Sequence, residues 1–139
     1  MSRHILKSVF PAALVLSAAI LAAASAGAAG LPAQSSDAGG VTMIVKPAEL
    51  SASAPVWVFQ VSLNTHSVDL SDDLARTAKL VDAAGKQYPA LAWEGDPPSG
   101  HHRKGTLRFQ PLKPLPAAVE LRVQRPGEAA ARTFRWKLK

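Results

Sequence analysis

Apolar and polar side chains alternate in short runs from residue 41 to the C-terminus, and turn-forming residues separate the runs. A period of two indicates β-strands that bury one face. Turn signals at this spacing are typical of an immunoglobulin-like, seven-stranded antiparallel β-sandwich, so the predicted fold class is all-β. The predicted strands cover residues 41–46, 55–64, 77–82, 87–93, 105–110, 118–124 and 131–138.

Three connecting segments carry their own predictions. The turn "AAGK" at 83–86 places Gly85 where a positive φ is needed, so the flanking strands should form a hairpin. The segment "PLKPLP" at 111–116 should cross between sheets or follow an edge, because proline cannot donate to a central ladder. One helical turn is expected in "SDDLARTA" at 71–78, with Ser71 as its N-cap.

The aromatic residues of the predicted strands are expected in the core rather than on a platform that stacks sugars or bases. At most one such residue per strand faces each side, which is too few for a platform. The set comprises Trp57, Phe59, Trp93, Phe109, Phe134 and Trp136.

Residues 1–29 have the pattern of a cleavable signal peptide. Arg3 and Lys7 precede an alanine-rich apolar run, and small residues at A-x-A spacing follow it. An uncleaved membrane anchor is the alternative, for which the run is short. The chain is therefore expected to be exported to the periplasm or outside the cell. The expected cleavage follows Ala26, Ala28 or Ala29.

The remaining chain is predicted to be a flexible linker, 30–40, followed by one β-sandwich domain, 41–139. The linker "GLPAQSSDAGG" has no apolar period. About 110 residues suffice for a single hydrophobic core. The sequence contains no cysteine, which excludes disulfides, a thiolate metal site and lipid attachment through a cysteine. A monomer is expected.

Charge is distributed unevenly. Residues 37–96 hold eight acids and four bases, whereas residues 103–139 hold ten bases and two acids. The bases in "TLRFQPLK", "VELRVQR" and "RTFRWKLK" alternate with apolar residues, which is typical of the solvent face of amphipathic strands. We therefore expect no nucleic-acid partner, and membrane contact only through an uncleaved N-terminal segment.

Three of the four histidines lie in two polar loops, "NTHSVDLSDD" and "SGHHRKG". If each connection reverses the chain direction, the loops 64–76, 94–103 and 125–130 meet at one end of the sandwich. We call these three loops the histidine pole. It would bring together His66, His101 and His102 with the acids Asp69, Asp72, Asp73, Glu94 and Asp96 and the bases Arg103 and Arg125.

Two hypotheses explain the histidine pole. In the first, the three histidines bind Cu(II) or Zn(II), because imidazole suits both metals and a carboxylate completes such sites. Adjacent histidines in a strand face opposite sides, so this site requires an irregular loop between Gly100 and Gly105. The predicted ligands are His66, His101 and His102, with Asp69 or Glu94.

In the second hypothesis, the same residues form a metal-free latch between two loops. His101 donates to Asp69 or Glu94, Arg103 clamps the loop, and the domain acts by contact with an envelope protein. Catalysis is the least supported reading. Ser67 follows His66, but the chain has no G-x-S-x-G elbow, so no enzyme is predicted.

The motifs "NTHSVDL", "WEG" and "GHHRKGTLRF" resemble those of a family of small exported prokaryotic β-sandwich domains of uncharacterised function. The resemblance spans residues 41–138 and implies the fold without an activity. The chain is more loosely similar to copper-resistance periplasmic β-sandwich proteins, which bind metal through histidines at one pole. It lacks their methionine-rich loop and N-terminal ligand.

Overall fold

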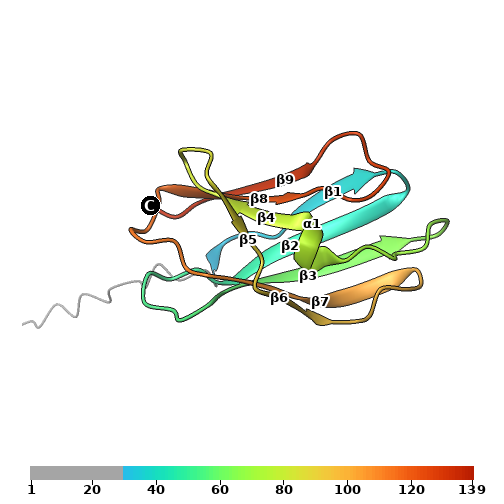
Figure 1. Cartoon of the computed structure of the whole chain (residues 1–139), viewed down its shortest axis with the longest axis horizontal. Coiled ribbons are helices and arrows are strands. Elements are labelled where there is room, and N and C mark those ends of the chain that lie inside the picture. Colours follow the sequence, from blue (N-terminus) through green and yellow to red (C-terminus); the bar gives the residue numbers. More distant parts are fainter. Residues whose placement is uncertain (1–29) are drawn as a thin grey trace, which may run out of the picture.

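The computed structural model describes residues 30–139 and shows an all-β, sandwich-like domain of two antiparallel sheets (Figure 1). The predicted signal peptide lies outside the described residues. One sheet has the strand order β1-β2-β3-β7-β6 and the other β5-β4-β8-β9. The elements are β1 (Gln34–Ala38), β2 (Val41–Glu49), β3 (Trp57–Thr65), α1 (Leu74–Thr77), β4 (Ala78–Val81), β5 (Gln87–Pro89), β6 (Ala92–Gly95), β7 (His102–Phe109), β8 (Ala118–Val123) and β9 (Arg132–Lys137).

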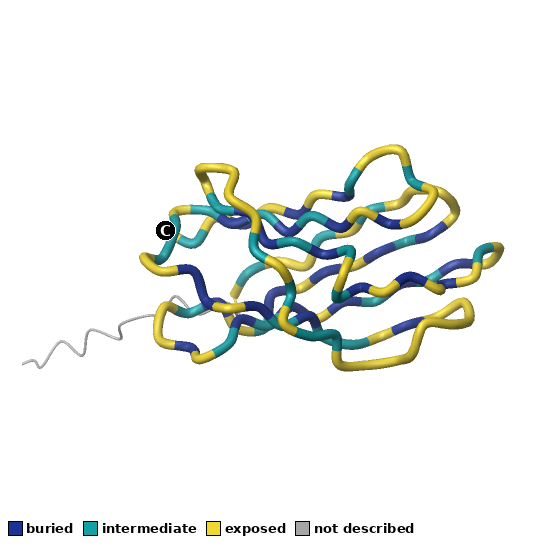
Figure 2. The backbone as a smooth tube through the Cα atoms, viewed as in Figure 1, coloured by how far each residue is buried: buried dark blue, intermediate teal, exposed yellow. Residues whose placement is uncertain are grey.

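Both sheets turn their apolar positions towards one shared core, so buried and exposed residues alternate along the strands (Figure 2). The rings of Phe59 and Phe109 meet edge to face, 5.7 Å apart, and Trp136 reaches Phe59 from the other sheet at 5.6 Å. Burying one such side chain fully contributes about 1.5–3 kcal/mol. The predicted core aromatics are confirmed, with Trp93 half-buried at the core margin.

The described residues form nine strands, not the seven predicted. One extra strand arises because the predicted strand 87–93 divides between the sheets. β5 pairs with β4, while β6 pairs with β7 in the other sheet. Pro89 has no N–H to continue the first ladder. Two residues later Leu91 N donates to Arg108 O at 2.7 Å, which joins the chain to β7.

The other extra strand is β1, which corrects the prediction of a flexible linker at 30–40. β1 pairs with β2 through a two-residue turn at Gly39 and Gly40, whose φ angles of 57° and 76° suit this hairpin type. None of its side chains is buried, so the apolar alternation that marks the other strands is absent. Instead, the Gln34 side chain accepts a hydrogen bond from Arg135 N at 3.1 Å.

The predicted connections are confirmed, with one correction. Gly85 has a φ of 84° in the β4–β5 turn, and the proline-rich segment 111–116 crosses from β7 in one sheet to β8 in the other. The single helical turn is α1, but Asp73, not Ser71, caps it by accepting from Ala75 N at 3.2 Å. No helix within residues 30–139 is long and apolar enough to span a membrane.

Candidate functional site

The histidine pole forms at one end of the molecule (Figure 1). The backbone N–H of Gly100 donates to Asp69 Oδ1 at 2.9 Å, which joins the second loop to the first. Arg125 pairs with Asp72 at 3.1 Å, which joins the third loop to the first. The predicted convergence of the three loops is therefore confirmed.

Backbone atoms hold the two histidine loops together. Thr65 N donates to His101 O at 3.0 Å, and Leu70 N donates to Gly100 O at 2.9 Å. Together with the bond between Gly100 and Asp69, these contacts fasten the two loops to each other. The atoms differ from those expected, because His101 contributes its carbonyl group rather than its imidazole.

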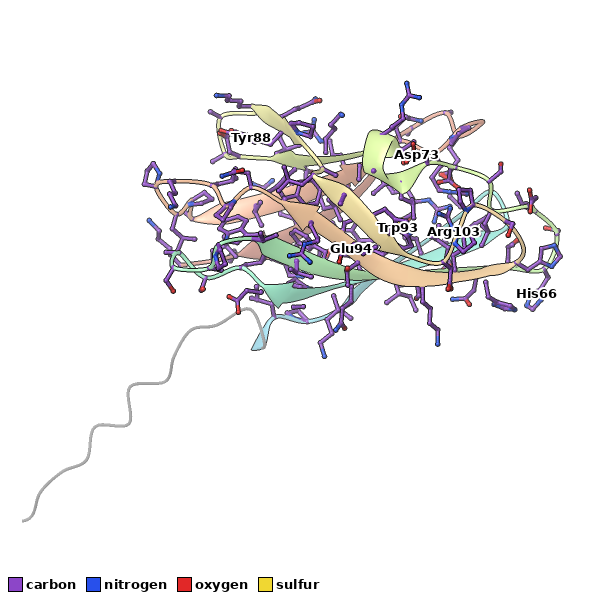
Figure 3. All side chains as sticks on the ribbon, turned by 60° about the horizontal axis from the view of Figure 1, so that its bottom comes forward. His66, Asp73, Tyr88, Trp93, Glu94 and Arg103 are labelled. Atoms are coloured by element: carbon purple, nitrogen blue, oxygen red, sulfur yellow. The ribbon has the colours of Figure 1, made fainter. Side chains whose placement is uncertain are left out.

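The imidazoles and the predicted carboxylates do not gather at one point. His102 faces outward from β7 and its Nδ1 lies 2.8 Å from Asn64 Oδ1 on β3, while His66 and His101 are exposed. Glu94 accepts from Arg108 Nη1 at 3.0 Å on the outside of the same sheet. Figure 3 shows His66 at the tip of the pole, far from Glu94.

Across residues 30–139, no three His, Cys, Asp or Glu side chains come close enough to hold a metal ion. The structure does not bring the predicted ligand set together. Two acids of the pole already accept backbone N–H groups: Asp69 from Gly100, and Asp96 Oδ2 from Lys104 N at 2.8 Å. Binding of Cu(II) or Zn(II) at this pole stays a prediction.

Beneath the loops, five charged side chains form a continuous buried series that we call the ion chain. Its members are Arg103, Asp72, Arg125, Glu128 and Arg132. Arg125 donates to both carboxylate oxygens of Asp72 and to Glu128 Oε1, each at 3.1 Å. Glu128 in turn accepts from Arg132 Nη2 at 2.8 Å. The ion chain links β7, the loops of the pole and β9.

Arg103 forms the first end of the ion chain and is 1 % exposed. Its Nη1 donates to Asp72 O at 2.7 Å and to Leu70 O at 3.2 Å, and the same atom lies 3.9 Å from Asp72 Oδ1. The guanidinium lies over the ring of Trp93, 5.4 Å from its centroid (Figure 3). Arg103 therefore fastens the first histidine loop to β7.

Arg132 forms the other end and holds the β1–β2 hairpin. Its Nη1 donates to Ser36 O at 2.8 Å and to Val41 O at 2.9 Å, and its Nη2 donates to Ala38 O at 2.7 Å. The planar guanidinium can serve several acceptors at once, which a lysine cannot do in this geometry. These bonds attach a strand that has no buried side chain of its own.

The ion chain stabilises charge on both of its central residues. Burial lowers the pKa of Arg125, but hydrogen bonds and ion pairs with Asp72 and Glu128 outweigh it and raise that pKa. Burial likewise raises the pKa of Glu128, but its bonds to Arg132 and Arg125 dominate and hold that pKa below the ordinary 4.5. Three guanidiniums face two carboxylates, and backbone carbonyls receive further N–H groups of Arg103 and Arg132. Arg103 Nε is buried without a hydrogen-bond partner among the described residues.

The three runs contain eight bases, and the expected exposure to solvent is correct for six and wrong for two. Arg125 and Arg132 were expected on solvent faces, yet they are 5 % and 4 % exposed. The sequence did indicate that Arg132 is buried, because Arg132, Phe134 and Trp136 are alternate residues of one strand and therefore point to the same, inward side. The bases that are exposed or half-buried are Arg108, Lys113, Arg122, Arg135, Lys137 and Lys139.

No protein-family model, curated protein or solved structure matches this chain. The resemblance to exported β-sandwich domains therefore stays a prediction.

Proposed function

We propose that this chain is an exported, immunoglobulin-like accessory domain of the cell envelope that acts by surface contact and needs no metal. In this proposal the histidine pole is a structural latch, and the ion chain beneath it keeps the loops and the β1–β2 hairpin in place. The domain is not an enzyme, and it works as a monomer.

The observation that carries the proposal is that carboxylates of the pole already accept hydrogen bonds from groups of the domain itself. Asp69 and Asp96 accept backbone N–H groups, and Asp72 is paired with Arg125. A metal ion that recruited one of them would leave a backbone donor or a buried guanidinium without its partner, which costs free energy. Three carboxylates of the pole are thus already bound to groups of the domain itself.

Strand order supports the immunoglobulin-like assignment. When the edge strand β1 is set aside, β2-β3-β7-β6 faces β5-β4-β8-β9. In chain order these eight strands correspond to an ABED sheet and a CFG sheet with one additional strand beside C, as in immunoglobulin domains. Domains of this kind commonly use their sheet faces and loops for contact.

Calorimetric titration of the chelator-treated protein with Cu(II) and with Zn(II) tests the proposal. We expect no stoichiometric binding at micromolar metal. The variant His66→Ala/His101→Ala/His102→Ala is the matched control for adventitious heat. Saturable binding in the wild type that this variant abolishes would overturn the proposal and establish the competing metal site.

A further inference from the structure

The outer face of the four-stranded sheet carries a concentration of positive charge. Its positions alternate with buried residues of β4, β8 and β9, so the side chains point away from the core. The strand register places Lys79 opposite Arg122, and Arg135 opposite Glu120. We call this surface the cationic face; it comprises Lys79, Glu120, Arg122, Arg135 and Lys137.

The cationic face holds four cations and one carboxylate, Glu120, and Asp82 of the β4–β5 turn borders it beside Arg135. Both carboxylates are already engaged, since Asp82 accepts from Lys86 N and from the Tyr88 hydroxyl. Glu120 Oε2 lies 2.8 Å from Arg122 Nη2 in a salt bridge between neighbouring positions of one strand. Lys79, Arg135 and Lys137 therefore remain available to an external anion. They come from two strands on opposite sides of β8, so their charges spread across the width of the sheet.

The cationic face lacks the features of a protein or nucleic-acid interface. Protein interfaces usually centre on apolar side chains, but the exposed large hydrophobics among residues 30–139 are Ile44 and Leu91, neither of which lies on this face. Single-stranded nucleic acids stack on aromatics, whereas Phe134 and Trp136 of β9 are buried in the core. A broad polar surface with spread cations fits an array of phosphate groups instead.

The chain enters the domain beside this sheet. Trp136 Nε1 donates to Pro32 O at 2.8 Å, so the segment that follows the predicted export signal runs along β9. β9 supplies two of the four cations, Arg135 and Lys137. Residues 8–24, which carry no charged side chain, precede this contact in the sequence. The described chain thus begins beside β9, the strand that supplies these two cations.

We propose that the cationic face docks on a membrane surface rich in anionic phospholipid headgroups. This names the partner of the contact module proposed above and rests on that function. Each Lys or Arg near an anionic membrane strengthens binding about fivefold. The attraction acts within a Debye length of about 8 Å at physiological ionic strength, so it requires this face to lie against the headgroups.

Vesicle co-sedimentation of the protein, as exported and processed by its expressing host, tests the proposal. Phosphatidylglycerol-containing vesicles are compared with vesicles of phosphatidylcholine alone, and the difference isolates the contribution of headgroup charge. The test variant is Lys79→Gln/Arg135→Gln/Lys137→Gln. The control is Lys46→Gln/Lys104→Gln/Lys113→Gln, which removes the same charge from exposed positions outside the cationic face.

We expect selective binding of the wild type to phosphatidylglycerol vesicles, weakening of about a hundredfold in the test variant, and a change of no more than a few-fold in the control. Equal weakening in both variants would mean that net charge, not this face, governs binding, and would overturn the proposal. The proposal would also be overturned if the wild type did not bind phosphatidylglycerol vesicles, or if it bound a soluble polyanion such as dextran sulfate but no vesicle.

Unchanged melting temperatures verify that both variants fold. If the protein does not bind vesicles, the proposed metal-free function is not contradicted. If the histidines bind metal, that function is contradicted, but membrane docking is not.

Discussion

Asp72 and Arg125, 53 positions apart in the sequence, form a buried two-pronged ion pair in which Arg125 Nε and Nη2 each donate to a different carboxylate oxygen at 3.1 Å. The pair connects the loop before α1 with the loop after β8. Removing one partner of a buried ion pair destabilises the fold, because the remaining charge is then neither paired nor solvated. The stability of the histidine pole should therefore depend on this pair and its neighbours.

Replacing Asp72 should lower the free energy of unfolding far more than replacing its neighbour Asp73. Asp72→Asn removes the charge that faces two buried guanidiniums, and we expect a loss of about 3–5 kcal/mol in the free energy of unfolding. Asp73→Asn is the matched control, since Asn caps a helix as well as Asp and a change within about 0.5 kcal/mol is expected. Urea denaturation measures both, and similar losses in the two variants would refute the role given to Asp72.

Arg132→Lys should loosen the β1–β2 hairpin selectively. A lysine cannot bond three backbone carbonyls and Glu128 together, and β1 has no buried side chain to compensate. Hydrogen exchange of residues 34–41 should accelerate about tenfold or more, with smaller changes in β8. Arg135→Lys on the outer face of the same strand provides the control. Unaltered protection of β1 in Arg132→Lys would show that backbone pairing alone holds this strand.

Acid should weaken the domain through Glu128. Because the ion chain holds the folded-state pKa of Glu128 below 4.5, its contribution is present above that pH and is lost as the pH falls through the lowered value. Glu128→Gln should be less stable than the wild type at neutral pH and should lose less additional stability between pH 5 and about pH 3. Urea midpoints across this range measure the effect; parallel pH profiles for the two proteins would contradict it.

Gly105→Ala should disturb the contact between β6 and β7. A Cβ at residue 105 would lie 2.6 Å from Glu94 O and 2.6 Å from Trp93 Cζ2, closer than packed atoms allow. The strand or the indole must shift, and overpacking of this kind costs about 1–3 kcal/mol. Gly30→Ala is the control, because a Cβ there meets no atom within 4 Å. Thermal unfolding compares the two, and a Gly105→Ala variant as stable as the control would refute the packing argument.

The location of the histidine pole could be predicted because the chain reverses direction as often as expected, although it forms more strands than expected. β5 and β6 are separated only by Ala90 and Leu91, so the chain changes sheets within a single run. The number of reversals along the chain was therefore correct. Local alternation fixes which face of a strand is buried, but it does not show which sheet a strand joins. Pro89 indicates where the first ladder stops, but not which strand the chain pairs with next.

The ion chain was only partly predictable. Arg103, Arg125 and Asp72 were placed at the pole by loop position, and Arg103 bonds the first histidine loop as expected. The pairing of Asp72 with Arg125 was not predicted. Arg132 carries a detectable signal, since a base at an inward strand position must find buried acceptors. Two of its backbone acceptors, Ser36 O and Ala38 O, lie in β1, whose sequence "QSSDA" has no apolar pattern. Backbone carbonyl groups that are distant in the chain cannot be identified as hydrogen-bond acceptors from a single sequence.

A double-mutant cycle between Asp72 and Arg125, measured in chelator and again with one equivalent of Zn(II) or Cu(II), tests most directly whether the histidine pole is held by its own ion chain rather than by metal. The cycle compares the free energies of unfolding of the wild type, Asp72→Asn, Arg125→Gln and the double variant. We predict a coupling of at least about 1.5 kcal/mol that is the same in chelator and in metal. A coupling near zero in chelator, or one that appears only when metal is added, would contradict this account.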